Sequence, residues 1–181
     1  MAAVKGEAGL VATATSLPPI TQILVVEGFQ PFRDFIKSVI RGETHLHVAC
    51  EARDGLDAVQ KAKELRPDSI LLDIGLPRLN GIEVARQISH LTPRPKIVFV
   101  SQESSAEIIQ EALSAGGIGY VLKPRAASDL LAAIEAALQG RKFVSDTARV
   151  AGRRSGPNRA GLEPGTVKRK RLSQFPHPGW I

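Results

Sequence analysis

Residues 69–77 read Ser-Ile-Leu-Leu-Asp-Ile-Gly-Leu-Pro, a short apolar run followed by an acidic residue and a turn. Residues 70–72 are apolar at successive positions, which is typical of a strand covered on both faces in a parallel sheet. Asp73 follows this run directly. The stretch therefore predicts a buried parallel strand with a carboxylate at its carboxyl end.

The same pattern recurs on both sides of this stretch. Apolar runs predict five strands, at residues 23–26, 46–49, 69–72, 96–100 and 119–122. Helical spacing of apolar residues predicts a helix after each strand, at residues 32–40, 56–65, 82–89, 108–113 and 130–138. Asp54-Gly55 and Asn80-Gly81 are typical helix starts, and Ser128 or Asp129 could cap the last helix. Five strand–helix units predict a three-layer α/β/α domain with a doubly wound parallel sheet.

Charge is distributed unevenly along the chain. The 181 residues carry 24 Lys+Arg and 18 Asp+Glu, a net charge of +6. Eight basic residues and one acidic residue follow position 146, so the basic character belongs to that end. This end is rich in Gly and Pro and lacks apolar periodicity. We therefore expect a flexible lead at residues 1–20, one folded domain at 21–145, and a disordered basic tail at 146–181.

Several classes of protein are disfavoured by composition. Cys50 is the single cysteine, which excludes an internal disulfide and favours the cytoplasm. No run of about 18 apolar residues predicts a membrane span. The tail is too short for a folded DNA-binding domain of about 60 residues, so we expect none. Its basic run at residues 168–171 leaves open a loose, salt-sensitive contact with nucleic acid or anionic lipid.

Polar side chains follow four of the predicted strands. Glu27, Asp73, Ser101 and Lys123 come directly after the first, third, fourth and fifth strands. Because an open parallel sheet binds its ligands at the carboxyl ends of its strands, we expect these four to meet at one edge. A carboxylate can attack phosphorus, a second can help to hold Mg²⁺, and lysine and hydroxyl can bind phosphoryl oxygens.

These residues lie in strings that resemble the CheY-like receiver domains of two-component response regulators. The strings cover about residues 22–145 and include Ile23-Leu24-Val25-Val26-Glu27, Leu71-Leu72-Asp73-Ile74-Gly75-Leu76-Pro77, Asn80-Gly81-Ile82-Glu83, Val98-Phe99-Val100-Ser101 and Gly119-Tyr120-Val121-Leu122-Lys123-Pro124. Three of these features are similar to receivers of the NarL/FixJ type: the string at residues 80–83, the string that contains Asp73, and Gly119-Tyr120. The resemblance implies the flavodoxin-like (βα)5 fold.

The resemblance also implies a role for each matching residue. Asp73 would accept a phosphoryl group from a sensor histidine kinase, and Lys123 would pair with the phosphoryl oxygens. Ser101 and Tyr120 would form the switch that alters a surface for an output protein, whose identity the sequence leaves open. Pro124 would follow a cis peptide bond. No catalysis beyond self-phosphorylation and slow hydrolysis is expected, so the chain is not predicted to be an enzyme.

One position departs from the family pattern. Such receivers usually carry two adjacent acids after the first strand, whereas this chain has Glu27-Gly28. The expected Mg²⁺ ligands are then Glu27, Asp73 and the Gly75 carbonyl, a set that predicts weak binding because one anionic ligand is missing. Two outcomes stay open: a phosphorylatable receiver with weakly held Mg²⁺, which we favour because Asp73, Ser101 and Lys123 are all present, or a phosphorylation-independent adaptor.

A third hypothesis is that the chain is an enzyme with the same strand–helix order, such as a small flavodoxin-like or hydrolase domain. It is the weakest, because neither a glycine-rich phosphate loop nor a nucleophile elbow is present. His45, His47 and Cys50 lie close together in sequence, but we interpret them as strand residues and not as a metal site, because a strand would place Cys50 on the opposite face from the two histidines. The sequence leaves the kinase, the output partner and the oligomeric state open.

Overall fold

The computed structural model describes residues 19–146, which form a parallel sheet flanked by helices. The strands are β1 (Thr21–Val26), β2 (Leu46–Ala52), β3 (Ser69–Leu72), β4 (Lys96–Ser101), β5 (Gly117–Leu122) and β6 (Phe143–Val144). They lie in the order β2-β1-β3-β4-β5-β6, and every neighbouring pair is parallel. The five predicted strands are confirmed. The short strand β6 was not predicted.

Three of the helices among residues 19–146 begin after a residue whose side chain caps them. The helices are α1 (Gln30–Ile40), α2 (Gly55–Leu65), α3 (Gly81–Ile88), α4 (Ala106–Ser114) and α5 (Ala126–Leu138), with a 3-10 turn η1 (Lys123–Arg125) before α5. Asp54, Asn80 and Ser105 accept hydrogen bonds from backbone N–H groups in the first turns of α2, α3 and α4. The prediction that Ser128 or Asp129 caps the last helix is wrong, because α5 already begins at Ala126.

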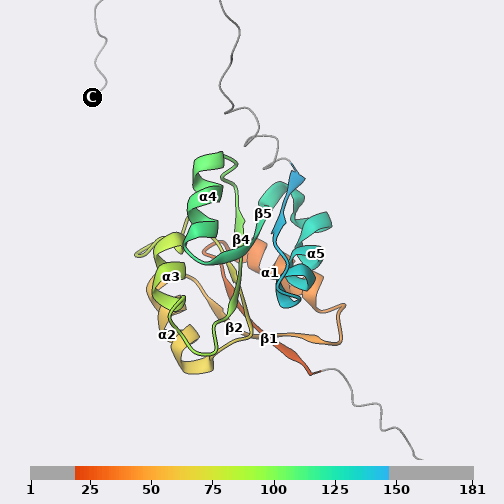
Figure 1. The fold of residues 1–181 in the computed structure, drawn as a ribbon. Coiled ribbons are helices and arrows are strands. Elements are labelled where there is room, and N and C mark those ends of the chain that lie inside the picture. Colours follow the sequence, from red (N-terminus) through yellow and green to blue (C-terminus); the bar gives the residue numbers. More distant parts are fainter. Residues whose placement is uncertain (1–18, 147–181) are drawn as a thin grey trace, which may run out of the picture.

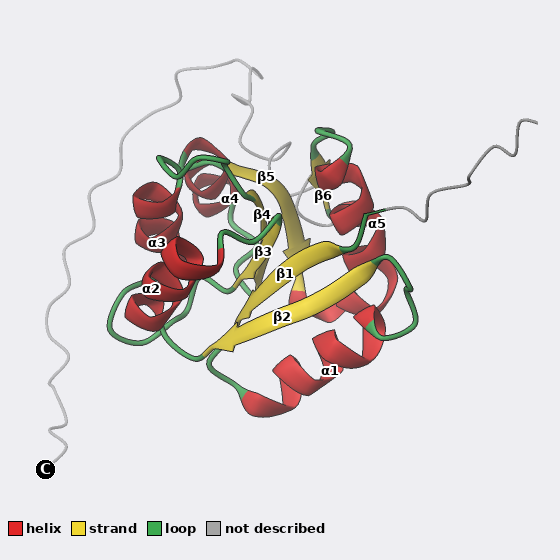
Figure 2. Cartoon of the chain, turned by 90° about the horizontal axis from the view of Figure 1, so that it is seen from below, coloured by secondary structure: helices red, strands yellow, loops and turns green. Residues whose placement is uncertain are grey.

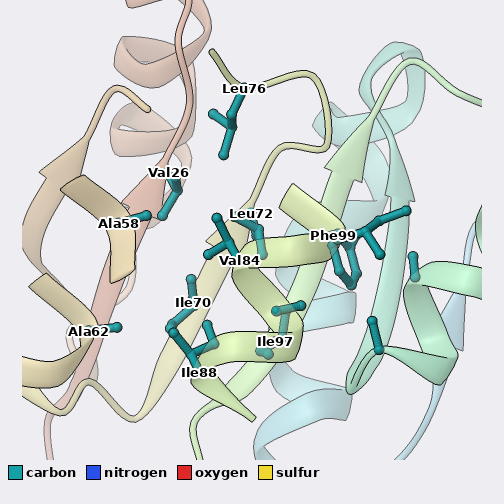
Figure 3. Close-up of a cluster of buried hydrophobic side chains, with 14 of the residues drawn as sticks. Val26, Ala58, Ala62, Ile70, Leu72, Leu76, Val84, Ile88, Ile97 and Phe99 are labelled. Atoms are coloured by element: carbon teal, nitrogen blue, oxygen red, sulfur yellow. The ribbon is translucent and has the colours of Figure 1, made fainter. Parts of the chain in front are cut away.

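Helices cover both faces of the sheet. Figure 2 shows α2, α3 and α4 on one side and α1 and α5 on the other. Each side has its own buried apolar cluster, and Figure 3 shows the one beneath α2 and α3, where Val26 and Leu72 of the sheet pack near Ala58 and Val84. Neighbouring residues on one strand therefore belong to different cores, as the continuous apolar runs predict.

The order of the strands determines where a ligand site can form. After β1 the chain adds β2 on one side, and it then crosses to add β3 on the other, so the strand order reverses between β1 and β3. Figure 1 shows β2 beside β1, and Figure 2 shows β3 between β1 and β4. In open α/β sheets a crevice forms at this point, outside the carboxyl ends of the strands. Glu27 and Asp73 are the residues that follow β1 and β3.

Candidate functional site

The ends of the strands bring the predicted polar side chains to one hollow. Lys123 Nζ lies 2.7 Å from Glu27 Oε2 and 3.0 Å from Asp73 Oδ2. Ser101, Gly28 and Gly75 line the same hollow, which has a volume of about 610 Å³. The carboxyl ends of β1, β3, β4 and β5 thus contribute to one site, as the sequence predicts.

Glu27 is held by contacts to both oxygens of its carboxylate. Oε1 accepts a hydrogen bond of 2.8 Å from the Phe29 backbone N–H, and Oε2 faces the Lys123 ammonium group. Only 3% of the side chain is exposed. A buried carboxylate needs such partners, because desolvation of its charge is otherwise costly.

Lys123 is fixed between the two carboxylates and an aromatic ring. Its Nζ lies 5.0 Å from the centre of the Phe32 ring, which is within the range of a cation–π interaction. The formal charges of Glu27, Asp73 and Lys123 add to −1. A further cation, or the charge of a phosphoryl group, therefore enters a site whose acids are already partly compensated.

Ser101 and Tyr120 both contact the backbone of Glu103, in the loop that leads to α4. Ser101 Oγ accepts a hydrogen bond of 3.1 Å from the Glu103 N–H, and the Tyr120 hydroxyl donates one of 2.8 Å to the Glu103 carbonyl. Tyr120 has no exposed surface, and burial raises its pKa to about 12. The loop is therefore tied both to the end of β4 and to a neutral phenol on β5.

The donors present suit Mg²⁺, but they are few. Glu27 and Asp73 offer carboxylate oxygens, and Gly75 lies beside Asp73, because a Cβ added at Gly75 would be 3.8 Å from Asp73 Oδ2. Hard oxygen ligands of this kind fit Mg²⁺, which retains several of its waters. Within residues 19–146 no group of three or more His, Cys, Asp or Glu side chains is placed to hold a metal ion. The set fits a weakly held, water-rich ion.

Other predictions have mixed outcomes. The cis bond expected before Pro124 is wrong: in the described residues the cis peptide is Thr92–Pro93, and Lys123 opens η1 with Pro124 in its first turn. His45 contacts Glu135 of α5 at 2.6 Å. The predictions for residues 1–18 and 147–181 lie outside the described residues.

Two buried polar features were missed from sequence. Arg33 of α1 is only 2% exposed and donates to the Glu27 and Gly28 carbonyls. Asp129 and Ser145, also buried, form a hydrogen bond of 2.6 Å that joins α5 to the residue after β6. Arg33 lies three residues before the buried Ile36 on α1, so the helical period places both on the same face, and this spacing was the sequence signal for the burial of Arg33.

Fold and site together define the class: a doubly wound α/β domain with two carboxylates and a lysine at its topological switch point. The family model for the response regulator receiver domain matches residues 23–135. The chain belongs to this family, and it carries the receiver domain of a two-component response regulator.

Relatives and solved structures agree with this assignment. The chain is 40% identical over 119 residues to the transcriptional regulatory protein YxjL of Bacillus subtilis, covering 66% of this chain and 51% of that protein. It is 31% identical to the chemotaxis protein CheY of Listeria monocytogenes over 116 residues, 64% of this chain and 97% of that one. The chain spans about half the length of the transcriptional regulators it matches.

Two solved structures have the same fold. A two-component response regulator of the LuxR family from Aurantimonas superposes with a TM-score of 0.70 at 29% identity, covering 75% of this chain and 97% of that one. The receiver domain of NarL from Mycobacterium tuberculosis gives 0.65 at 25% identity, covering 68% and 100%. No helix among residues 19–146 is long and apolar enough to cross a membrane.

Proposed function

We propose that Asp73 accepts a phosphoryl group from the phosphohistidine of a sensor histidine kinase, and that the domain then changes a surface that an output protein recognises. The observation that carries this proposal is the position of Lys123 Nζ, 3.0 Å from Asp73 Oδ2 and 2.7 Å from Glu27 Oε2. A carboxylate beside a fixed ammonium group, open to a hollow, has the parts that phosphoryl transfer requires.

The transfer is a substitution at phosphorus. A carboxylate oxygen of Asp73 forms the new P–O bond while the P–N bond of the phosphohistidine breaks, and the imidazole leaves with the bonding electron pair and gains a proton. Lys123 balances the charge of the phosphoryl oxygens, and Glu27 holds Lys123 in place. Mg²⁺, when bound by Glu27, Asp73 and the Gly75 carbonyl, would supply further charge compensation at those oxygens.

The acyl phosphate would act on the rest of the domain through Ser101 and Tyr120. The Ser101 hydroxyl can donate a hydrogen bond to a phosphoryl oxygen, and turning the side chain toward the phosphoryl group would pull Oγ away from the Glu103 N–H from which it accepts. The loop before α4 then moves, together with the Tyr120 hydroxyl that is bonded to the Glu103 carbonyl. We infer that the surface of α4, β5 and α5 changes as a result and binds the output protein.

Phosphorylation is tested by mass analysis after treatment with acetyl phosphate and MgCl₂. We expect one added phosphoryl group in the wild type, none in Asp73→Asn, and undiminished labelling in Asp57→Asn, which alters a surface acid paired with Lys61. Labelling of Asp73→Asn to the same extent as the wild type would refute the assignment of Asp73.

A second function, a phosphorylation-independent adaptor, is favoured by one observation: Gly28 offers no carboxylate, and Lys123 already compensates part of the charge of the two acids that remain. Beryllofluoride with MgCl₂ separates the two functions. Shifts of the backbone amide signals of Asp73, Ser101 and Lys123 are expected for the switch, whereas an unchanged spectrum at millimolar Mg²⁺ supports the adaptor.

A further inference from the structure

Arg33 is a fully buried cation beneath the turn that carries Glu27. It lies on the inner face of α1 and is 2% exposed. Its Nη1 donates hydrogen bonds of 2.5 Å to the Glu27 carbonyl and 3.0 Å to the Gly28 carbonyl, and its Nη2 donates to the Gln30 side chain. Two successive carbonyls of the turn between β1 and α1 are thus bound by a single nitrogen.

One peptide unit in this turn is held at both ends. The unit between Gly28 and Phe29 presents its carbonyl to Arg33 Nη1 and its N–H to Glu27 Oε1, at 2.8 Å. Rotation of this peptide would break both hydrogen bonds. The orientation of the Glu27 carboxylate therefore depends on the same contact that fixes the Gly28 carbonyl.

Gly28 makes such a constraint necessary. A glycine has more backbone freedom than any other residue, so ordering it costs more entropy. Its missing side chain also leaves Glu27 as the acid that follows β1 in the hollow. A hydrogen bond from a rigid side chain to each flanking carbonyl removes this freedom without using a side chain at position 28.

The guanidinium group is itself anchored from a neighbouring strand. Glu51 of β2 places Oε2 3.3 Å from Arg33 Nε, while Glu51 Oε1 lies 2.9 Å from Lys37 Nζ. Burial of a guanidinium group is costly, and an apolar residue could fill the same space at lower cost. The planar fork of arginine can reach the two carbonyls and Glu51 at once, which a lysine ammonium group cannot do in the same geometry.

We propose that Arg33 is a positioning residue for the phosphorylation site: it holds the turn at Gly28 so that the Glu27 carboxylate stays in the hollow that Asp73 also lines and can share a divalent cation with it. This inference rests on the proposed function of Asp73. Arg33 reaches the site only through the backbone of the turn and through Glu27. It therefore acts on the affinity for the cation and not on the bond that forms at Asp73.

The test compares Mg²⁺ affinity in folded variants, measured by the shift of the Phe29 and Asp73 amide signals during titration with MgCl₂. In Arg33→Lys we expect an affinity about tenfold weaker, as is usual when a residue supporting a metal ligand is lost. Faster hydrogen exchange at the Phe29 amide is also expected, because its acceptor Glu27 is less well held. Labelling by acetyl phosphate should need more Mg²⁺ but reach the wild-type rate at saturation.

Lys37→Met is the matched control. Lys37 lies on the same helix and shares Glu51 with Arg33. Its ion pairs are with Asp34 and Glu51 and not with the turn at Gly28, so wild-type affinity is expected. Glu51→Gln, which weakens the anchor, should have a smaller effect than Arg33→Lys and serves as a second variant if Arg33→Lys does not fold. Unchanged Mg²⁺ affinity in the folded variants overturns the proposal, as does an equal loss in Lys37→Met.

The proposed function can fail separately. If acetyl phosphate does not label the wild type at any Mg²⁺ concentration, phosphorylation of Asp73 is refuted, while the titration and the exchange of the Phe29 amide still decide the role of Arg33. A wild-type chain that binds no Mg²⁺ overturns the inference directly.

Discussion

Position 28 has room for the acid that this family usually carries. A Cβ built on Gly28 would lie 3.6 Å from the Arg53 carbonyl oxygen and 3.8 Å from Pro77 Cδ, which are ordinary van der Waals contacts. Its backbone is not among the positive-φ glycines either. A side chain can therefore be added without strain, and the weak donor set can be tested by restoring the acid.

We predict that Gly28→Asp raises Mg²⁺ affinity about tenfold, since it adds an anionic oxygen ligand to a site with two carboxylates. Calorimetric titration with MgCl₂ measures this change. Gly42→Asp is the matched control, because it adds the same charge to an exposed glycine with space around its Cβ. Equal gains in both variants would show a general charge effect and contradict a ligand role at position 28.

The site residues could be predicted from sequence to different degrees. Glu27, Asp73 and Lys123 follow apolar strands, and parallel topology alone implies that their positions share an edge. Arg33 could not be predicted in the same way. Its place on the buried face of α1 follows from the helical period, but its partners are backbone carbonyls, which leave no trace in the sequence pattern.

At the scale of elements, the end of the domain is held by a buried cluster around Asp129. Burial by itself would raise the pKa of Asp129, but hydrogen bonds from Arg125, Ser128 and Ser145 outweigh it and lower the pKa to about 2. Ser145 Oγ also accepts a hydrogen bond from the Leu122 N–H. The cluster therefore joins α5, β5 and the residue after β6.

The depressed pKa has a consequence for stability. The pKa of Asp129 falls from 3.8 to about 2 on folding, so the cluster stabilises the fold above about pH 4, and this stabilisation is lost as the pH falls toward 2. The shift corresponds to about 2 kcal/mol at neutral pH. We predict that Asp129→Asn lowers the free energy of unfolding by about this amount at pH 7 and by almost nothing near pH 2.

Urea denaturation at several pH values checks this prediction. Asp57→Asn, which breaks an ion pair with Lys61 at the surface, should cost at most about 1 kcal/mol. A loss in Asp129→Asn that is the same at pH 2 and pH 7 would show that the carboxylate charge is not responsible.

At the scale of the whole molecule, two adjacent leucines of β3 belong to different cores. Leu71 is 1% exposed and packs in the cluster under α1 and α5, while Leu72 is fully buried in the cluster under α2, α3 and α4. We predict that Leu71→Ala and Leu72→Ala each lower the free energy of unfolding by about 3 kcal/mol, because each leaves a cavity in a packed interior.

Thermal or urea unfolding measures both variants against Leu56→Ala. Leu56 is 51% exposed, so its truncation should cost less than about 1 kcal/mol. A large loss in only one of the two β3 variants would contradict a sheet that is covered on both faces.

The sequence alone determines the order of strands and helices and the buried character of the strands. It also determines that two acids and a lysine follow strand ends. Hydrophobic periodicity and turn residues act locally, so they can be recognised without the folded structure. Only the folded structure decides the distances within the site and the position of the buried Arg33 guanidinium beneath the Gly28 turn. The same holds for the extra strand β6 and for the Asp129–Ser145 contact. Each of these joins groups through backbone atoms or across elements far apart in sequence, where packing, and not the local pattern, decides which atoms meet.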